Sequence, residues 1–298
     1  LPPKELNPLA PSKPGSLTEI PESDYEVVVF DNRSPSLAAP TSSFKATDNP
    51  DFSSPAIASA GKCEVICFTS DYESSFKDLS HLQIRTVLEA WRDRTAELSE
   101  LSYIEYIAAF ENRGEEVGVT LNHPHGQIYA YSYLPPKTQR MLEVATAHKK
   151  KSGNILLEDI LARELSDKVR IVAENEHWVA YVPYASRYPF EIHLAPRRRV
   201  PDFLALDEAA SDAFAPIAKE VLIRLDGVFG VKMPYIASWH QAPVRTGRDL
   251  LSLHWQIASV RRAPGKLKYL AGSESAFGAF MMDLKPEQSA AQLRDVAL

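Results

Sequence analysis

The sequence predicts an α+β fold built from two tandem repeats, each an antiparallel sheet with packed helices. Three observations predict it. Runs with strand character follow one another with few helices between them, four segments carry apolar residues at helical spacing, and one order of strand, helix and strand occurs twice. With 45% apolar and 24% charged residues, the 298 residues can bury one large core or two coupled cores. We therefore expect an N-terminal repeat over residues 1–150 and a C-terminal repeat over residues 151–298.

The chain begins with a predicted arm. Residues 1–22 are rich in proline, serine and lysine without periodicity, which predicts an extended arm on the surface or on a partner subunit, outside the core. Residues 25–30 predict the first strand, and the serine-rich residues 40–55 predict a long loop. In the following strand, Cys63 and Cys67 lie four residues apart and hence on one face, which favours a buried structural pair over a disulfide or a zinc site.

The helices are predicted from periodic apolar residues. Between residues 79 and 101, apolar side chains recur at helical spacing among charged ones, which predicts an amphipathic helix that covers one face of the sheet. Similar patterns predict helices over residues 137–150, 155–164 and 207–227. The strands predicted after the first helix cover residues 104–111, 128–133, 169–174, 177–183 and 191–195.

The repeat is indicated by an order of segments that recurs. In the first half, VVFDNRSP precedes a long helix, a strand and LNHPHGQI; in the second, VAYVPYASRYP precedes a strand, a helix and SLHWQI. A tandem duplication would explain this order. It would place His254 at the position of His123, and Gln256 at that of His125.

The charge and hydropathy of the chain argue against two classes of partner. A formal net charge of −6 argues against a dedicated nucleic-acid-binding protein, because such proteins carry basic patches that displace counterions from the phosphate backbone. No apolar run approaches the ~18–20 residues that cross a bilayer, and the first residues do not resemble a secretory leader. We therefore expect a cytoplasmic protein without membrane or nucleic-acid partners.

The most informative segment is Asn122-His-Pro-His-Gly-Gln127, at the start of a strand. Pro124 fixes its own backbone and biases His123 towards extended geometry, so the chain leading to His125 is stiff. Gly126 allows a ligand to approach the backbone. Imidazole is a nucleophile near neutral pH when an acceptor holds one ring nitrogen and the other is free. The combination favours a nucleophilic His125 over histidines that only pack or bind a metal.

Gln127 indicates the kind of leaving group. Its amide can donate to a phosphoryl oxygen without supplying a titratable proton. A hydrolase that expels an alkoxide or amine benefits from a general acid, for which histidine is the expected residue. A sugar phosphate leaves readily as an anion, since a phosphate monoester has a second pKa of about 6. Gln127 therefore favours transfer with a phosphate leaving group.

Glu111-Asn-Arg-Gly114, followed by the HPHGQ segment, resembles the active-site signature of the galactose-1-phosphate uridylyltransferases, members of the histidine-triad (HIT) superfamily. The resemblance extends from about Tyr25 to Arg294, through VVFDN, ICF, AELSEL, FENRG, HPHGQIYA, VPYASRYPFE and SWHQAP. It implies a HIT-like fold in both repeats, with the catalytic segment in the N-terminal one.

The resemblance implies a ping-pong exchange of UMP between UDP-glucose and galactose 1-phosphate. His125 takes the uridylyl group, glucose 1-phosphate leaves, and galactose 1-phosphate then forms UDP-galactose. Gln127 holds the phosphoryl oxygens in both steps, and His123 orients the loop. The further residues that it implies, for binding the nucleotide phosphates and the uridine, are Asn112, Thr120 and Asn32.

The sugar site is implied to lie between the subunits of a homodimer. Four residues match a segment that reaches the hexose of the neighbouring subunit's substrate: Lys268, Tyr269, Ala271 and Glu274. Two positions depart from the family pattern, because Ser273 replaces a tyrosine and Phe280 replaces a glutamine. Lost hydrogen-bonding groups change sugar specificity. They favour an alternative in which a nucleotidyl transferase or phosphorylase of this fold acts on another sugar phosphate or nucleotide sugar.

The metal sites of relatives are not matched. Their zinc site, two cysteines and two histidines, matches Asn7, Ala10, Tyr72 and His123. Their iron site matches Met141, His240, His254 and Gln256. One zinc ligand of four cannot hold zinc, and two histidines with an amide form a weak site. We therefore expect no required metal or cofactor. Relatives also carry an N-terminal segment, with arginines that reach the active site, ahead of the region that matches Asn7.

Two further classes of protein fit the residues of the HPHGQ segment and Asn112 less well than a nucleotidyl transferase does. A non-enzymatic nucleotide-binding protein derived from a decayed transferase would not need His125, Gln127 and Asn112 intact. A metal-dependent hydrolase would need a third histidine or a carboxylate cluster at coordinating spacing. A nucleotidyl transferase is therefore the first hypothesis.

Overall fold

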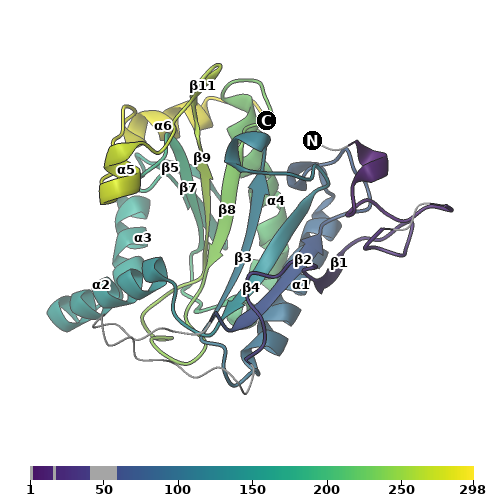
Figure 1. Cartoon of the computed structure of the whole chain (residues 1–298). Coiled ribbons are helices and arrows are strands. Elements are labelled where there is room, and N and C mark those ends of the chain that lie inside the picture. Colours follow the sequence, from purple (N-terminus) through teal and green to yellow (C-terminus); the bar gives the residue numbers. More distant parts are fainter. Residues whose placement is uncertain (1–2, 16–17, 41–58) are drawn as a thin grey trace.

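The computed structural model describes residues 3–15, 18–40 and 59–298. Within these residues the strands form one nine-stranded antiparallel sheet, in the order β1-β2-β4-β3-β8-β9-β7-β6-β5, and a separate two-stranded hairpin, β10-β11 (Figure 1). The strands are β1 (Val28–Asp31), β2 (Gly61–Cys67), β3 (Tyr106–Arg113), β4 (His125–Tyr131), β5 (Ile171–Glu174), β6 (Trp178–Tyr181), β7 (Phe190–Pro196), β8 (Tyr235–His240), β9 (His254–Ser259), β10 (Arg261–Ala263) and β11 (Lys266–Leu267).

The helices predicted from periodicity are present, and their ends lie within a few residues of the predicted ones. The α-helices are α1 (His81–Ser99), α2 (Pro136–Ser152), α3 (Leu156–Asp167), α4 (Glu208–Gly227), α5 (Gly272–Phe277) and α6 (Pro286–Arg294). Short 3-10 turns cover Lys4–Leu6, Phe76–Asp78, Glu115–Val117 and Phe203–Ala205. The α+β class is confirmed.

The two halves of the chain meet in the middle of the sheet. β3, from the first half, pairs with β8, from the second, and Phe110 lies opposite Ser238. On one side of this pair lie β4, β2 and β1; on the other lie β9, β7, β6 and β5. The predicted boundary at residue 150 falls inside α2. The division into two repeats at that residue stays a prediction, since the strands form a continuous sheet.

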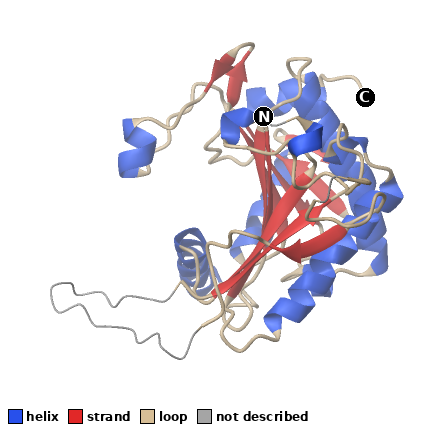
Figure 2. Cartoon of the chain, turned by 45° about the vertical axis from the view of Figure 1, so that its right-hand side comes forward, coloured by secondary structure: helices blue, strands red, loops and turns tan. Residues whose placement is uncertain are grey.

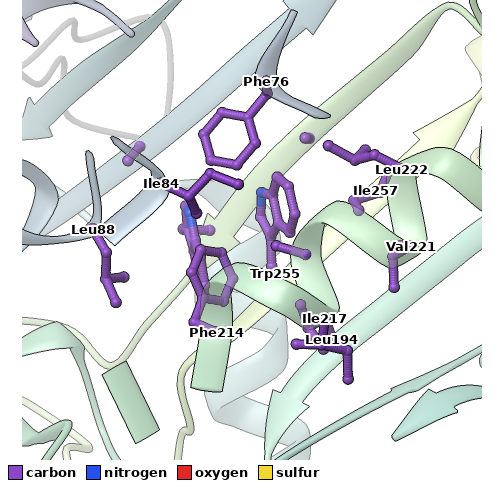
Figure 3. Close-up of a cluster of buried hydrophobic side chains, with 14 of the residues drawn as sticks. Phe76, Ile84, Leu88, Leu194, Phe214, Ile217, Val221, Leu222, Trp255 and Ile257 are labelled. Atoms are coloured by element: carbon purple, nitrogen blue, oxygen red, sulfur yellow. The ribbon is translucent and has the colours of Figure 1, made fainter. Parts of the chain in front are cut away.

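The main hydrophobic core lies between one face of the sheet and helices α1 and α4 (Figure 2). Trp239 of β8 and Trp255 of β9 stack with ring centroids 5.6 Å apart. Trp91 of α1 packs edge-on against Trp239, at 5.6 Å. Figure 3 shows Phe214 of α4 close to Trp255, and their ring centroids are 5.8 Å apart. This aromatic cluster fixes α1 and α4 on the sheet.

Helix α1 begins at a capping box. The backbone N–H of Gln83 donates to Ser80 Oγ at 3.2 Å, and the backbone N–H of Ser80 donates to Gln83 Oε1 at 3.0 Å. Ile84 and Leu88 then enter the core, whereas Leu82, which also fits the apolar spacing, is 69% exposed. Leu82 lies in the first turn of α1.

The opposite face of the sheet is covered by α3 near the β5 edge. Leu161 and Leu165 of α3 pack against Val179 and Tyr181 of β6. The β1, β2, β4 and β3 part of this face has no such helix over it among the described residues (Figure 2). Side chains of β4 that point away from the core therefore remain accessible.

The N-terminal arm differs from its prediction. Leu9 and Ile20 are 5% and 1% exposed, and they form a small core with Val65 and Cys67 of β2. The expectation that the arm lies outside the core is wrong, because its few apolar side chains pack on the face of β2, the strand next to the edge strand β1. The loop predicted over residues 40–55 lies, apart from Pro40, outside the described residues.

The two cysteines and the apolar length of the helices can also be compared with the predictions. Cys63 and Cys67 are both free thiols and are buried, as predicted. None of the helices in the described ranges is both long enough and apolar enough to cross a membrane.

Candidate active site

The HPHGQ segment enters the sheet at the start of β4. β4 lies between β2 and β3, with His125 opposite Cys67 and Gln127 opposite Phe110. Burial alternates along the strand, so His125 and Gln127 point away from the core while Gly126 points towards it. β4 therefore begins three residues before the strand predicted over residues 128–133. The cross-strand pairing of the whole segment was not visible from its composition.

A small pocket of about 70 Å³ lies beside this strand. Asn112 at the end of β3, Thr120 in the following loop, and His125 and Gln127 of β4 all line it. Four of the residues predicted for the site are therefore brought together. The pocket has the size of a phosphoryl group, whereas sites for whole small-molecule ligands usually occupy about 300–1,000 Å³.

His125 is held by the backbone of its own loop. Its Nδ1 lies 2.7 Å from the carbonyl oxygen of His123 and donates to it. Burial lowers the pKa of His125, although the bond to the His123 carbonyl opposes this shift. The ring is therefore neutral near neutral pH, and its single proton is on Nδ1. Nε2 keeps a lone pair that is available for attack on an electrophile.

His123 is anchored inside the protein. The ring is 1% exposed, and its Nε2 lies 2.8 Å from the hydroxyl of Tyr25. The ring of Tyr72 lies 5.9 Å from it, between centroids. Burial lowers the pKa of His123 to about 4, so the imidazole is neutral. His123 thus lies behind the loop, in keeping with the orienting role predicted for it.

The side-chain amide oxygen of Gln127 accepts a hydrogen bond within the chain. Asn32, just after β1, donates from Nδ2 to Gln127 Oε1 at 3.3 Å. The Nε2 donors of Gln127 are therefore left to face the pocket. The resemblance placed Asn32 near the uridine; in the structure it contacts Gln127 and sets the direction of its amide.

Gly126 lines the pocket and also allows close packing of the sheet. A Cβ on this residue would lie 2.8 Å from the carbonyl oxygen of Phe110 and 2.9 Å from the ring of Phe68. Both contacts are on the core side of β4. The hydrogen at this position therefore lets β3 and Phe68 pack closely against β4, and the approach of a ligand to its backbone stays a prediction.

The predicted sugar-site residues lie elsewhere in the chain. Lys268, Tyr269, Ala271 and Glu274 belong to the segment around β11 and α5, which projects from the sheet on the side away from β1 (Figures 1 and 2). Lys268 Nζ donates to Glu274 Oε1 at 2.8 Å, whereas Tyr269 is 76% exposed. None of the described residues that line the pocket at His125 comes from this segment.

A similar arrangement occurs at the start of β9. His254 is the first residue of that strand, and its Nδ1 lies 3.0 Å from the carbonyl oxygen of Ser252, two residues earlier. His125 makes the same contact at the start of β4, and Gln256 follows His254 as Gln127 follows His125. The expected correspondence of His254 with His123 is therefore wrong. His254 corresponds to His125, because each of these two histidines is the first residue of its strand.

Lys137 joins this second cluster. Its Nζ donates to Gln256 Oε1 at 2.5 Å and lies 3.3 Å from His240 Nε2. Glu191 accepts from Gln256 Nε2, and its Oε1 lies 3.1 Å from His193 Nε2. Although burial opposes the shift, His193 lowers the pKa of Glu191 to about 2. In the sequence, only the alternation of Glu191 and His193 within an apolar strand could have indicated this cluster.

Some of the residues that were matched to metal sites make other contacts. Of those matched to the zinc site, His123 bonds through Nε2 to the Tyr25 hydroxyl, and Asn7 Oδ1 accepts from the backbone of Leu9 at 2.9 Å. Of those matched to the iron site, His240 has its Nε2 3.3 Å from Lys137 Nζ. Among the residues that the structure describes, no three His, Cys, Asp or Glu side chains are grouped so that they could hold a metal ion.

Comparison with known proteins matches almost the whole chain to one family. Residues 2–135 match the N-terminal domain of galactose-1-phosphate uridyl transferase, and residues 141–298 match its C-terminal domain. A galactose-1-phosphate uridylyltransferase of Streptomyces lividans is 43% identical over 99% of this chain and 80% of its own length. That of Thermotoga maritima is 34% identical over 93% of this chain and 86% of its own length.

Solved structures agree with these matches. A uridylyltransferase superposes with a TM-score of 0.87 at 29% identity, covering 98% of this chain and 90% of its own. An ADP-glucose phosphorylase from Arabidopsis thaliana shares the fold, with a TM-score of 0.78 at 23% identity over 92% of this chain and 83% of its own. The sheet, the HPHGQ pocket and both sequence matches lead to one conclusion: the chain belongs to the galactose-1-phosphate uridylyltransferase family.

Proposed function

We propose that this chain is a hexose-1-phosphate uridylyltransferase, which exchanges UMP between UDP-glucose and galactose 1-phosphate through a uridylyl-His125 intermediate. Family membership supports the reaction class. The observation that carries the mechanism is the 2.7 Å bond from His125 Nδ1 to the carbonyl of His123, which leaves Nε2 unprotonated beside the pocket. A nucleophilic imidazole needs this state of the ring.

Each half of the reaction exchanges one bond at phosphorus. His125 Nε2 attacks the uridylyl phosphorus of UDP-glucose, the bond to the bridging oxygen breaks, and glucose 1-phosphate leaves with the electron pair. A phosphate oxygen of galactose 1-phosphate then attacks the same phosphorus, and the P–N bond breaks to release UDP-galactose. Gln127 Nε2 and Asn112 donate to the phosphoryl oxygens in both steps, where negative charge develops. No general acid is required.

The pocket supports a second proposal, that the enzyme is a homodimer. Its volume of about 70 Å³ fits the reacting phosphoryl group, and the sugar and base need further surface. Lys268 and Glu274, which match the family's hexose-binding segment, lie in a different part of the same chain. A partner subunit would supply them to each site. The cytoplasmic location predicted from the sequence stays a prediction.

Intact-protein mass spectrometry after incubation with UDP-glucose tests the covalent step. We expect a uridylyl increment on the wild type and none on His125→Ala. His254→Gln, which alters the corresponding histidine of β9, is the matched control and should still form the adduct. If the wild type acquires no increment from any UDP-sugar, the mechanism is wrong.

The sugar requires its own test, because Ser273 and Phe280 depart from the family pattern. In the structure Ser273 Oγ donates to Ala279 O at 2.8 Å, and the ring of Phe280 lies 5.5 Å from the guanidinium of Arg187. The departure of these two residues from the family pattern is the reason to test the alternative, a transferase or phosphorylase for another sugar phosphate or nucleotide sugar. Galactose 1-phosphate should discharge the adduct as UDP-galactose; discharge only by another hexose 1-phosphate, or by inorganic phosphate, supports the alternative.

We also propose that the reaction requires no bound metal. The side chains at both positions where relatives hold a metal are engaged with Tyr25, Lys137 and each other. Elemental analysis should find much less than one zinc or iron per chain, and the adduct should form at the same rate after treatment with a chelator. Loss of the adduct on chelation, with recovery on adding zinc, would contradict this proposal.

Mixed dimers test whether each site uses both subunits. His125→Ala and Lys268→Ala should each be inactive alone. After dissociation and reassociation at equal amounts, half of the dimers carry one intact site, which should restore about a quarter of the wild-type activity. No recovery, with dimers present, would place Lys268 and His125 of one chain in the same site.

A further inference from the structure

Tyr25 lies in the segment that leads into β1, outside the pocket at His125. Its hydroxyl is 2.8 Å from His123 Nε2. The segment is tied to the loop after β2, since the backbone N–H of Ser70 donates to the Tyr25 carbonyl at 3.3 Å and Ser70 Oγ donates to Asp24 at 2.7 Å. Tyr25 is therefore held from both its backbone and its ring.

The Tyr25 hydroxyl and His123 Nε2 form a hydrogen bond in which either group can be the donor. Burial raises the pKa of Tyr25 well above its ordinary value, so the phenol is neutral. The ring of His123 is 1% exposed. A buried ring nitrogen that loses its hydrogen-bond partner carries an unmet desolvation cost, so the bond fixes the rotation of the ring.

His123 contacts the ring of His125 through its backbone carbonyl group, so the orientation of His123 affects that of His125. The His123 carbonyl accepts from His125 Nδ1 at 2.7 Å, and the residue between them is Pro124, whose backbone has little freedom. With the ring of His123 held by Tyr25 and the chain beyond it stiffened by Pro124, the carbonyl has one direction. That direction selects the Nδ1–H tautomer of His125 and aims its Nε2 at the pocket.

We propose that Tyr25 is a positioning residue for the nucleophile, acting through His123 to hold His125 in its reactive tautomer. The tautomer and orientation rest on the observed contacts; only the kinetic consequence rests on the proposed function. Tyr25 does not line the pocket. Its loss should therefore slow the chemical step without weakening the binding of the nucleotide sugar.

The kinetic test compares Tyr25→Phe with Tyr72→Phe. Both variants keep the aromatic ring beside His123, whose centroid lies 6.5 Å from that of Tyr25 and 5.9 Å from that of Tyr72. Only the first removes the hydroxyl that is hydrogen-bonded to His123 Nε2. In single-turnover uridylylation by UDP-glucose, Tyr25→Phe should lower the rate constant about 10- to 100-fold, with KM unchanged, because a small misalignment of a reacting atom has effects of this size. Tyr72→Phe should leave the rate near that of the wild type.

A spectroscopic test does not depend on the reaction. In protein labelled with ¹⁵N-histidine, His125 should give the NMR pattern of a single Nδ1–H tautomer, assigned by its absence in His125→Ala. Tyr25→Phe should give a mixture of tautomers, whereas Tyr72→Phe should not. Circular dichroism and thermal unfolding confirm that each variant is folded at the temperature used.

The outcomes separate the two proposals. An unchanged His125 spectrum in Tyr25→Phe overturns the positioning role, whether or not the variant is slow. If the wild type forms the adduct and Tyr25→Phe forms it at the same rate, the positioning role is overturned as well. If the wild type forms no adduct, the proposed function fails, and the tautomer comparison alone decides the role of Tyr25.

Discussion

The side-chain amide of Gln127 suits a phosphoryl group in only one of its two orientations. Asn32 Nδ2 binds Gln127 Oε1 at 3.3 Å, which turns the Nε2 donors towards the pocket. A donor aimed at developing negative charge is worth about 2.7–4 kcal/mol in comparable sites. We therefore expect Asn32 to affect catalysis through its contact with Gln127.

A residue at position 32 that accepts a hydrogen bond from Gln127 should slow adduct formation more than a residue that makes no hydrogen bond to it. In Asn32→Asp, a carboxylate accepts from Gln127 Nε2 and turns Oε1 towards the phosphoryl oxygens. We expect adduct formation at least about tenfold slower than in Asn32→Ala, which leaves the amide able to turn either way. Single-turnover rates measure this difference. Equal rates in the two variants would show that Asn32 does not set the amide.

Gly126 is predicted to matter for stability. A methyl group there meets the Phe110 carbonyl and the Phe68 ring below 3.0 Å, so Gly126→Ala should lower the free energy of unfolding by about 1–3 kcal/mol. Gly272→Ala is the control, because a Cβ at Gly272 has nothing within 4 Å. Urea unfolding of both variants measures the effect. A Gly126→Ala protein as stable as the control would contradict the packing role.

At the scale of elements, α1 is attached to β2 by charge as well as by apolar packing. Glu64 of β2 has a side chain that is 3% exposed, and Arg94 of α1 binds both its oxygens, at 2.8 and 2.9 Å. Lys62 lies 3.1 Å from the same carboxylate. The pair fixes the position of the helix along the strand next to the catalytic one.

Replacing only Arg94 should lower the free energy of unfolding more than replacing Arg94 and Glu64 together. Arg94→Met leaves Glu64 buried with only Lys62 beside it, and should lower the free energy of unfolding by about 3 kcal/mol. Adding Glu64→Leu should recover much of that loss, because the uncompensated carboxylate is gone. Chemical unfolding of the single and double variants tests the coupling. A double variant less stable than Arg94→Met would argue against it.

For the whole molecule, stability depends on histidines that are buried in the neutral form. Burial, together with His193, lowers the pKa of His254 to about 3. The unfolded chain binds a proton at this histidine below about pH 6.5, but the folded protein does not until the pH nears its lowered pKa. Between these two values the unfolded state binds more protons. The folded state is therefore destabilised as the pH falls, and recovers as it rises.

His254→Gln should reduce this pH dependence. For the wild type, the contribution of His254 falls by about 3 kcal/mol between about pH 6.5 and pH 4, and the variant should lack that part of the loss. His81→Gln, which alters an exposed histidine at the start of α1, is the matched control. Unfolding by urea across the pH range measures the difference. Parallel curves for the wild type and His254→Gln would exclude this role.

The sequence alone was enough to predict the four longest helices and the candidate nucleophile. Apolar spacing was enough for α1 and α4, because one face of each helix must be buried whatever it packs against. HPHGQ indicated His125 and Gln127, because their chemistry depends on residue type and on neighbours within the same segment. The strands β8 and β9 and the short helices α5 and α6 were not predicted.

Only the tertiary structure decided how the site is supported. Asn32, Tyr25 and His123 lie far apart in the sequence, and they meet because β1, β2 and β4 are adjacent in the sheet. Lys137 and Glu191 form a second cluster for the same reason. A hydrogen bond between distant residues depends on strand order and register, which local sequence patterns do not encode. The candidate nucleophile could therefore be predicted from the sequence, whereas the residues that contact it from other strands could not.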